Sequence, residues 1–320
     1  MQAVKVVILK TTSTKKFDIL GLGCTAVDDV VYVPTYPGVD VKTPILGSVR
    51  RCGGLTGIAI VAATRIGAVC NYAGCLGTDE FSRYVAEYFK DEGINLSDAP
   101  YLPEGRVIHS VIIVARDTGS RNIFYENAGM IGAHHSLPAE SIITDTKVLF
   151  IDHYGMSGNL RAARIAKAAG IPIVADFEDA SSPQFNEVMS LVDHLVLSAG
   201  FSRQITGMST PEKAALALWE NTRAVVIVTC GAQGCWSVSA ENPTDAIHHP
   251  AFRVTSSDTT GCGDVFHGAY AARLAAGDDL SDRIRYAMAA AALKASEIEI
   301  PTLDAVERFL DSQSKLNCQT

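Results

Sequence analysis

The regular alternation of short apolar strands with helices between residues 147 and 238 is the feature that most constrains the fold. Strands are predicted at 147–151, 171–175, 194–197 and 224–229, and the helices between them at 160–169, 184–191 and 210–219. Such βαβ units build a mostly parallel sheet that is covered by helices on both faces. Ligands of these sheets lie beyond the carboxyl ends of the strands. The residues that we expect at such ends are Asp28, Asp152, Asp176, Ser198 and Gly231.

A glycine-containing loop, Asp258-Thr-Thr-Gly-Cys-Gly-Asp264, precedes a predicted helix of small and apolar residues that Gly277 closes. Backbone N–H groups without bulky side chains, at the positive end of a helix, form a cradle for an anion. A carboxylate at the mouth of that cradle would repel a phosphate, so Asp264 needs a reason to be there. It can take a proton from a hydroxyl that attacks the bound phosphate. The alternative is that Asp264 only caps the helix.

The first predicted strand, residues 17–23, ends in a pattern that partly matches a dinucleotide fingerprint, Gly21-x-Gly23-x-x-Ala26. That fingerprint requires a helix to follow, whereas here a β-branched segment follows and soon reaches Pro34. We interpret the segment as a strand that delivers Asp28 or Asp29 to a pocket. Ordinary turn carboxylates remain the alternative.

A second glycine loop and a hairpin interrupt the α/β pattern. Gly53-Gly54 opens a predicted helix that Gly67 closes, and residues 106–126 form a hairpin around the turn at 117–120. Together with the predicted strands at 30–33 and 41–49, this hairpin could form a small separate sheet. Further helices are predicted at 79–93, 280–296 and 303–312. The helix at 280–296 is rich in alanine, so it either packs closely against a neighbouring helix or leaves room for the flat ring of a ligand.

Composition excludes several classes of function. The chain has 320 residues and a net charge of −8, with no Lys/Arg cluster larger than a pair, so we expect no nucleic-acid partner. No apolar run reaches the length of a membrane span, and residues 1–16 do not read as a signal peptide. Eight cysteines without a C-x-x-C pair indicate reduced thiols and a cytoplasmic protein.

These motifs, with Thr229-Cys-Gly-Ala-Gln-Gly234, occur in an order that resembles the ribokinase (PfkB carbohydrate kinase) family over residues 17–312. The C-terminal half looks closest to bacterial sulfofructose-kinase-like members. The resemblance implies a ribokinase-like three-layer α/β/α sandwich with a mostly parallel central sheet and a small β-sheet lid. It implies a main domain of 17–29, 51–104 and 128–312, a lid of 30–50 and 105–127, and tails at 1–16 and 313–320. It also implies a homodimer formed through the lid.

The resemblance implies roles for individual residues. Asp264 matches the catalytic base, and Gly261, Cys262 and Gly263 match the anion hole. The positions implied to bind the acceptor are Asp28, Gly53 and Gly54, with Arg121 and His153 as candidates beside them; for Arg121 the alternative is a solvated turn arginine. The positions implied to bind the nucleotide are Ser198, Thr229, Gly231, Gly234, Ala289 and Ala292.

The chain departs from the family pattern at several positions. Leu55 and Ile58 stand where members that bind ribose or fructose carry Asn, and Ser198–Phe201 replaces an Asn-x-x-Glu motif that organises Mg²⁺. Asp176 or Glu178 could substitute for the missing Glu. The segment 296–301 replaces a glycine-containing loop, which argues against monovalent-cation activation. No Arg lies near His153, which argues against a sulfonated sugar bound as in the closest subgroup.

We therefore expect a kinase that uses ATP and Mg²⁺ and phosphorylates a primary hydroxyl of a sugar or sugar-like acceptor. A nucleoside or other small-molecule kinase of the same fold is the first alternative, because Leu55 and Ile58 could face a base. A non-catalytic sugar or nucleotide sensor is the second. The lost Asn-x-x-Glu motif favours the sensor, and the retained Asp264 argues against it.

Overall fold

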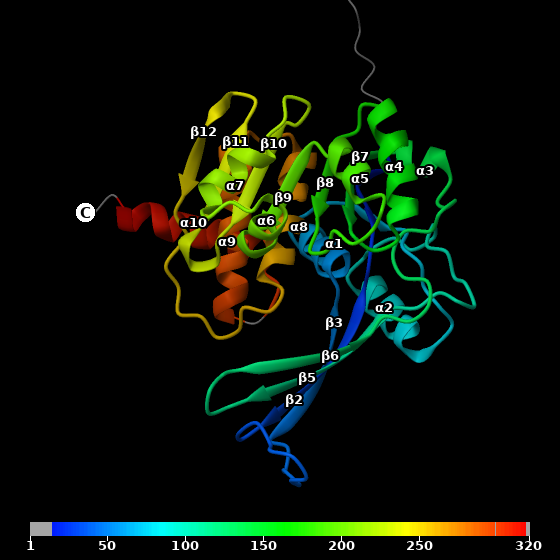
Figure 1. Ribbon diagram of the computed structural model, residues 1–320, viewed down its shortest axis with the longest axis vertical. Helices are drawn as coiled ribbons and strands as arrows, with labels where there is room; N and C mark the ends of the chain where they lie inside the picture. Colours follow the sequence, from blue (N-terminus) through cyan, green and yellow to red (C-terminus); the bar gives the residue numbers. More distant parts are fainter. Residues whose placement is uncertain (1–14, 298, 318–320) are drawn as a thin grey trace, which may run out of the picture.

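The predicted alternation folds into an eight-stranded central sheet with the strand order β12-β11-β10-β9-β8-β7-β1-β4 (Figure 1). This computed structural model describes residues 15–297 and 299–317; most of the predicted N-terminal tail and the last three residues lie outside this range. The six strands from β10 to β4 are parallel, and β11 and β12 extend the sheet antiparallel. The strands are β1 (Phe17–Leu22), β4 (Cys70–Tyr72), β7 (Thr146–Asp152), β8 (Ile173–Asp176), β9 (His194–Ser198), β10 (Val225–Thr229), β11 (Cys235–Ser239) and β12 (Asn242–His249).

Helices cover both faces of this sheet and complete the three layers that were expected. Side chains of α1 (Leu55–Arg65), α8 (Cys262–Ala276) and α9 (Leu280–Glu297) pack on one face, with α2 (Glu80–Asp91) and α10 (Leu303–Asn317) at its periphery. The other face carries α3 (Glu140–Thr144), α4 (Met156–Ala168), α5 (Phe185–Leu191), α6 (Ala199–Thr206) and α7 (Pro211–Leu218). The parallel strands are apolar on both faces because both faces are buried.

The helices α1 and α8 approach each other very closely. A methyl group built on Gly268 would lie 2.8 Å from the carbonyl carbon of Ala59 and closer still to its oxygen. At the start of the two helices, Ile58 lies next to Gly261. Both helices therefore begin at the same edge of the molecule and pack backbone to backbone.

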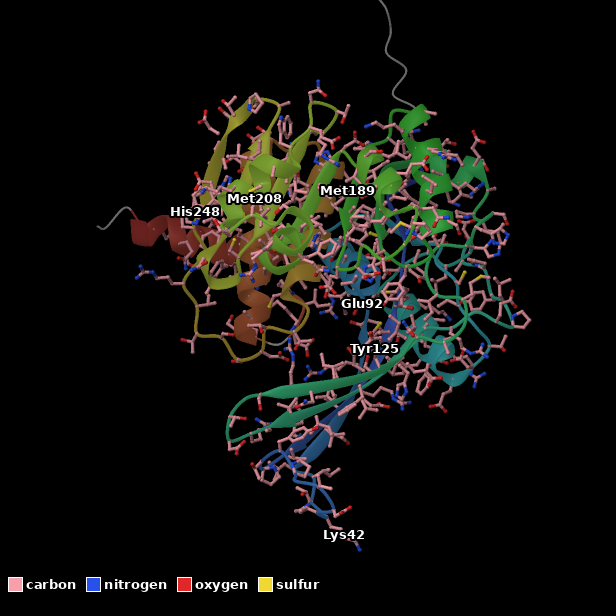
Figure 2. The ribbon with its side chains drawn as sticks, in the orientation of Figure 1. Lys42, Glu92, Tyr125, Met189, Met208 and His248 are labelled. Atoms are coloured by element: carbon pink, nitrogen blue, oxygen red, sulfur yellow. The ribbon has the colours of Figure 1, made fainter. Side chains whose placement is uncertain are left out.

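A second sheet projects from the main body, at the bottom of Figure 1. Its four strands have the order β3-β2-β5-β6, and they are β2 (Ala26–Val33), β3 (Gly47–Gly53), β5 (Ile108–Ala115) and β6 (Arg121–Glu126). β2 pairs antiparallel with β3 and parallel with β5, and β6 closes the hairpin predicted from the sequence. In Figure 2, Tyr125 lies where this sheet meets the main body and Lys42 marks its far tip.

Several predicted elements are corrected by the structure. The strand expected at 41–49 begins only at Gly47 and continues through Gly53, into what was predicted to be a loop. Residues 34–46 form no strand; Pro44 lacks the N–H needed for a ladder, and Val39 and Val41 are exposed. Asp28 lies within β2 and not at the end of a central strand. β12, α3 and α6 were not predicted, and the last helix extends to Asn317.

Candidate active site

The carboxyl ends of neighbouring strands bring two buried carboxylates together. Asp152 ends β7 and Asp176 ends β8, and the two are register partners across the strand pair. Asp152 accepts hydrogen bonds from the backbone N–H of Cys24 at 2.7 Å, the Thr56 hydroxyl at 2.8 Å and the N–H of Tyr154 at 2.7 Å. Its carboxylate is fully engaged, so Asp152 organises the edge where β1, β7 and α1 meet.

The loop before α8 has the geometry of an anion cradle. Gly261 is the N-cap of α8 and adopts a left-handed conformation, with φ of 74°, which glycine reaches without strain. The first N–H groups of a helix have no acceptor within the helix. A methyl group built on Gly263 would meet no atom within 4 Å, so the approach to this turn is open. A 15-residue helix begins here, and its dipole adds positive potential at the same point.

Asp264 stands in the first turn of α8, beside this cradle. Burial raises the pKa of Asp264 well above its usual value, and the negative charge of Asp176 raises it further. The charge of His267 opposes this shift. A carboxylate with a raised pKa is a stronger base than an ordinary one and is suited to accept a proton near neutral pH.

His267 lies one helical turn after Asp264 and is buried. Its Nδ1 lies 2.8 Å from the carbonyl oxygen of Gly263 and 3.3 Å from Oδ2 of Asp176, and its Nε2 lies 3.0 Å from the carbonyl oxygen of Val196. A carbonyl oxygen can only accept, so a ring nitrogen of His267 can bond to one only by donating its proton. The sequence analysis did not assign a role to this residue, although it lies only three positions after the run that ends at Asp264.

The two glycines of the second loop pack against β2 and the residue before it, and Gly53 leaves room for Asp28. A methyl group built on Gly53 would lie 3.0 Å from Cγ of Asp28 and closer still to one carboxylate oxygen. Gly54 has a φ of 88°, and a methyl group there would lie 2.6 Å from Cα of Thr25. Burial raises the pKa of Asp28, while a hydrogen bond from Ser110 and the charge of Arg51 lower it in part. The structure therefore brings Asp28, Gly53 and Gly54 together.

Strand alternation places Asp28, Arg51, Ser110 and Arg121 on one face of the second sheet, which we call the inner face. The inner face contacts the loop before α8. Nη1 of Arg51 lies 3.4 Å from Oδ2 of Asp258, and Nη1 of Arg121 donates to the Thr260 hydroxyl at 2.7 Å. Of the candidate acceptor residues, Asp28, Gly53 and Arg121 thus lie on the sheet that meets the candidate phosphate loop, whereas Gly54 follows β3 and His153 follows β7.

The opposite, outer face of the second sheet is attached to α2. Arg50 donates to both carboxylate oxygens of Asp29, at 2.7 and 2.9 Å, and its guanidinium lies over the ring of Phe81. The ring of His109 stacks on Phe81 with centroids 4.1 Å apart, and its Nε2 lies 3.0 Å from Asp29. Asp29, the alternative to Asp28 in the sequence analysis, therefore ties the sheet to the main body.

The candidate nucleotide residues have local roles in the structure. Ser198 caps α6 by accepting from the N–H of Phe201 at 3.1 Å, and the Thr229 hydroxyl donates to the carbonyl of Leu197 at 3.4 Å. Gly231 has a φ of 56° and opens the short 3₁₀ helix η1 (Gly231–Gln233). Gly234 has a φ of 89°, and a methyl group there would lie 2.7 Å from the backbone nitrogen of Ala251.

The two alanines of α9 differ in exposure. Ala289 is fully buried in the core between α9 and the central sheet, whereas Ala292 is half-buried. Of the two, only Ala292 has surface left for a ligand.

The candidate metal residues and His153 lie close to one another beyond β7 and β8. The N–H of Glu178 donates to Nδ1 of His153 at 3.3 Å. Burial raises the pKa of Asp176, and the charges of Glu178 and Asp152 raise it further. Within residues 15–297 and 299–317, no group of three His, Cys, Asp or Glu side chains could hold a metal ion by itself.

The amino-acid sequence of this chain is similar to those of carbohydrate kinases. A family model described as pfkB family carbohydrate kinase matches residues 48–300. Fructokinase-1 of Oryza sativa subsp. japonica is 28% identical over 295 residues, which cover 83% of this chain and 88% of the relative. Ribokinase of Haemophilus influenzae is 27% identical over 308 residues, which cover 91% and 97%.

Two solved structures show the same fold. The ribokinase of Arabidopsis thaliana complexed with ribose and ATP has a TM-score of 0.82 at 20% identity, covering 92% of this chain and 98% of that one. An E. coli protein provisionally described as ribokinase II, in complex with ATP and Mg²⁺, has a TM-score of 0.77 at 23% identity, covering 92% and 99%.

Proposed function

Because the chain belongs to the pfkB family of carbohydrate kinases, we propose that it transfers the γ-phosphate of ATP to a primary hydroxyl of a sugar or sugar-like acceptor. One observation carries this proposal. The inner face of the second sheet, which bears Asp28, contacts the loop that bears Asp264 through Arg51 and Arg121. An acceptor held by Asp28 would therefore lie between the two, within the region where Asp264 can take its proton.

In this mechanism Asp28 orients the acceptor and Asp264 removes the proton of the attacking hydroxyl. The N–H groups of the turn at Gly261, Cys262 and Gly263 stabilise the phosphoryl group as charge develops on it. The second sheet acts as a lid that excludes water, so that ATP is not simply hydrolysed. On the nucleotide side, Thr229, Gly231 and Ala292 line the binding region.

The residues present fit a magnesium ion. Asp176 and Glu178 concentrate negative charge at the strand ends, as the effect of the Glu178 charge on the pKa of Asp176 indicates. Mg²⁺ usually takes one or two carboxylates and completes its shell with water and substrate phosphates, so a full protein cage is not required. When bound, it would neutralise charge on the phosphates. We propose Asp176 and Glu178 as the residues that hold it.

Two further features complete the proposal. Val111 and Phe124 form an exposed cross-strand pair on the outer face, at 36% and 54% exposure, and we propose that this face joins two copies into a homodimer. Analytical ultracentrifugation of the wild type and of Phe124→Asp tests this, and we expect the variant to sediment as a monomer.

Seven cysteines within the described range are free thiols, which favours a reducing compartment such as the cytoplasm. No helix of the described residues could cross a membrane.

The test is ADP release from ATP and Mg²⁺ against a panel of ketoses, aldoses, their amino and sulfonated forms, and nucleosides. The wild type and Asp264→Asn are compared, and we expect the variant to lose about 10²–10⁴-fold in kcat, the usual size of a general-base contribution. Nucleotide binding should be retained. A variant with near wild-type turnover would exclude Asp264 as the base. A response to nucleosides alone would favour the alternative that the apolar side chains of Leu55 and Ile58 suggest.

A further inference from the structure

The Ala-rich helix α9 carries one lysine at a position where a charge is unusual. Lys294 has only 7% of its surface exposed, and its neighbours in the helix include the buried Ala290 and Leu293. No carboxylate of the described residues lies within ion-pair distance of its ammonium group, and no described atom accepts a hydrogen bond from it. Its nitrogen is not one of the fully enclosed polar atoms without a partner among the described residues, so the stem of Lys294 is buried while its charged tip stays open to solvent and to an anionic ligand.

The side chain of Lys294 points to the loop before α8. Its Cε lies 4.0 Å from the position that a Cβ of Gly261 would take, in the space where Oδ2 of Asp264 is also a neighbour. The backbone N–H groups of Ser257 and Asp258 donate to the carbonyl of Ala295, at 2.7 and 3.2 Å. The loop is thereby fixed to the end of α9, with Lys294 held against it.

The nearby acidic groups do not use this charge as an ion pair. Asp258 already accepts from the N–H of Thr260 at 2.8 Å and lies 3.4 Å from Arg51. The charge of His267 lowers the pKa of Asp264 against the effect of burial. The ammonium of Lys294 acts through space on two groups of the loop, because its charge lowers the pKa of Asp258 and partly offsets the effect of burial on the pKa of the Cys262 thiol. Its positive charge is thus directed at the anion cradle.

We propose that Lys294 is a phosphate-binding residue that contacts the terminal phosphoryl groups of the nucleotide. This inference rests on the proposed function in taking ATP as the ligand. Two independent positive features, the N-terminus of α8 and the side chain of Lys294, lie close to Gly261, and a phosphoryl group is the ligand that both would stabilise. In this proposal Lys294 assists the loop N–H groups in binding that group.

The experiment measures nucleotide binding by calorimetry, without any acceptor, for the wild type, Lys294→Met and Lys294→Arg. The ligands are AMP, ADP and a non-hydrolysable ATP analogue. We expect Lys294→Met to bind the ATP analogue about 10- to 100-fold more weakly, the usual size of a charge-assisted hydrogen bond, and to bind AMP as the wild type does. Lys294→Arg should recover most of the loss. Lys213→Met, at an exposed position of α7, is the matched control and should leave all three affinities unchanged.

Thermal unfolding without ligand separates this role from a structural one. If Lys294 serves a bound phosphate, Lys294→Met removes a charge that has no ion-pair partner among the described residues, and the melting temperature should stay equal or rise. If Lys294 instead stabilises the C-terminal end of α9, the variant should melt several degrees lower. Any one of three results would overturn the proposal. These are a lower melting temperature of Lys294→Met, an unchanged affinity of this variant for the ATP analogue, and a loss of affinity for AMP as large as the loss for the ATP analogue. Because no acceptor is needed, absence of sugar phosphorylation by the wild type would refute the proposed function and leave this test intact.

Discussion

Replacing Gly53 by Ala tests whether Asp28 orients the acceptor. The new methyl group would lie 3.0 Å from Cγ of Asp28 and nearer to one carboxylate oxygen, whereas ordinary contacts of a Cβ begin at 3.4 Å. The two closest atoms belong to the end of the flexible Asp28 side chain, and Cβ of Ala26 at 3.3 Å needs to give by only about 0.1 Å, so the backbone can stay nearly in place. The carboxylate must shift by about 1 Å, and a misplacement of this size near a reacting group costs about 10²-fold in rate.

Stability should change little in the same variant. Gly53 ends β3, and alanine in a strand is favoured over glycine by about 0.5–1 kcal/mol, which offsets the local crowding. We therefore expect a free energy of unfolding within about 1 kcal/mol of the wild type, together with kcat/KM for the acceptor lower by about 10²-fold. The KM for ATP should be unaffected.

The matched control is Gly47→Ala at the other end of the same strand, where a methyl group would meet no atom within 4 Å. Both variants are assayed with the best acceptor of the panel, and both are unfolded in urea. If Gly53→Ala keeps kcat/KM within two- or three-fold of Gly47→Ala, then the position of the Asp28 carboxylate does not matter for the acceptor, and the assignment of Asp28 is wrong.

Three further predictions concern the helix pair, the lid contact and the base. Gly268→Ala should destabilise the protein by about 1–3 kcal/mol in urea unfolding, because its methyl group meets the backbone of Ala59; an unchanged midpoint would contradict this packing. Arg121→Ala and Thr260→Val should lower kcat/KM non-additively, since they remove the same hydrogen bond; strict additivity would mean that the bond is absent during turnover. Asp264 has a raised pKa, so the folded state holds its proton more tightly than the unfolded state, and the ligand-free protein should lose stability as the pH rises from about 4 towards the folded pKa. In Asp264→Asn the melting temperature at pH 7 should therefore be higher and this slope flatter; a lower melting temperature would show that the charged form is stabilised.

The α/β fold with its separate sheet could be predicted because its signals are local. Apolar strands buried on both faces and helices closed by glycine are visible in short windows of sequence. The segment 41–46 was wrongly predicted to be a strand because its β-branched residues suggest one, while pairing depends on a neighbouring strand that the sequence does not reveal. β12 was missed because its residues are polar and mostly exposed, so no hydrophobic alternation marks it.

For the site, motifs identified the two glycine loops but not the charges around them. Asp264 and Gly261 stand in one short run, and the Gly53–Gly54 pair is equally compact. Arg51, His267 and Lys294 could not be assigned, because each acts on residues distant in the sequence. The lone lysine within an alanine-rich helix was the one available signal for Lys294. The position of Asp28 was predicted wrongly because the chain leaves the central sheet after Leu22 and enters the second sheet at Ala26, where β2 begins.

The close packing of α1 against α8 has a consequence for how such an enzyme can change its substrate. With the backbones in contact at Gly268, no deformable side chain separates the two helices, and they move as one body. One helix follows the Gly53–Gly54 loop and the other follows the loop at Gly261, which we propose to bind phosphate. Under the proposed mechanism, the spacing between acceptor and phosphate is fixed by this packing, while the inner face of the second sheet is free to vary. We therefore expect mutation of that face to alter acceptor preference without altering the geometry of phosphoryl transfer.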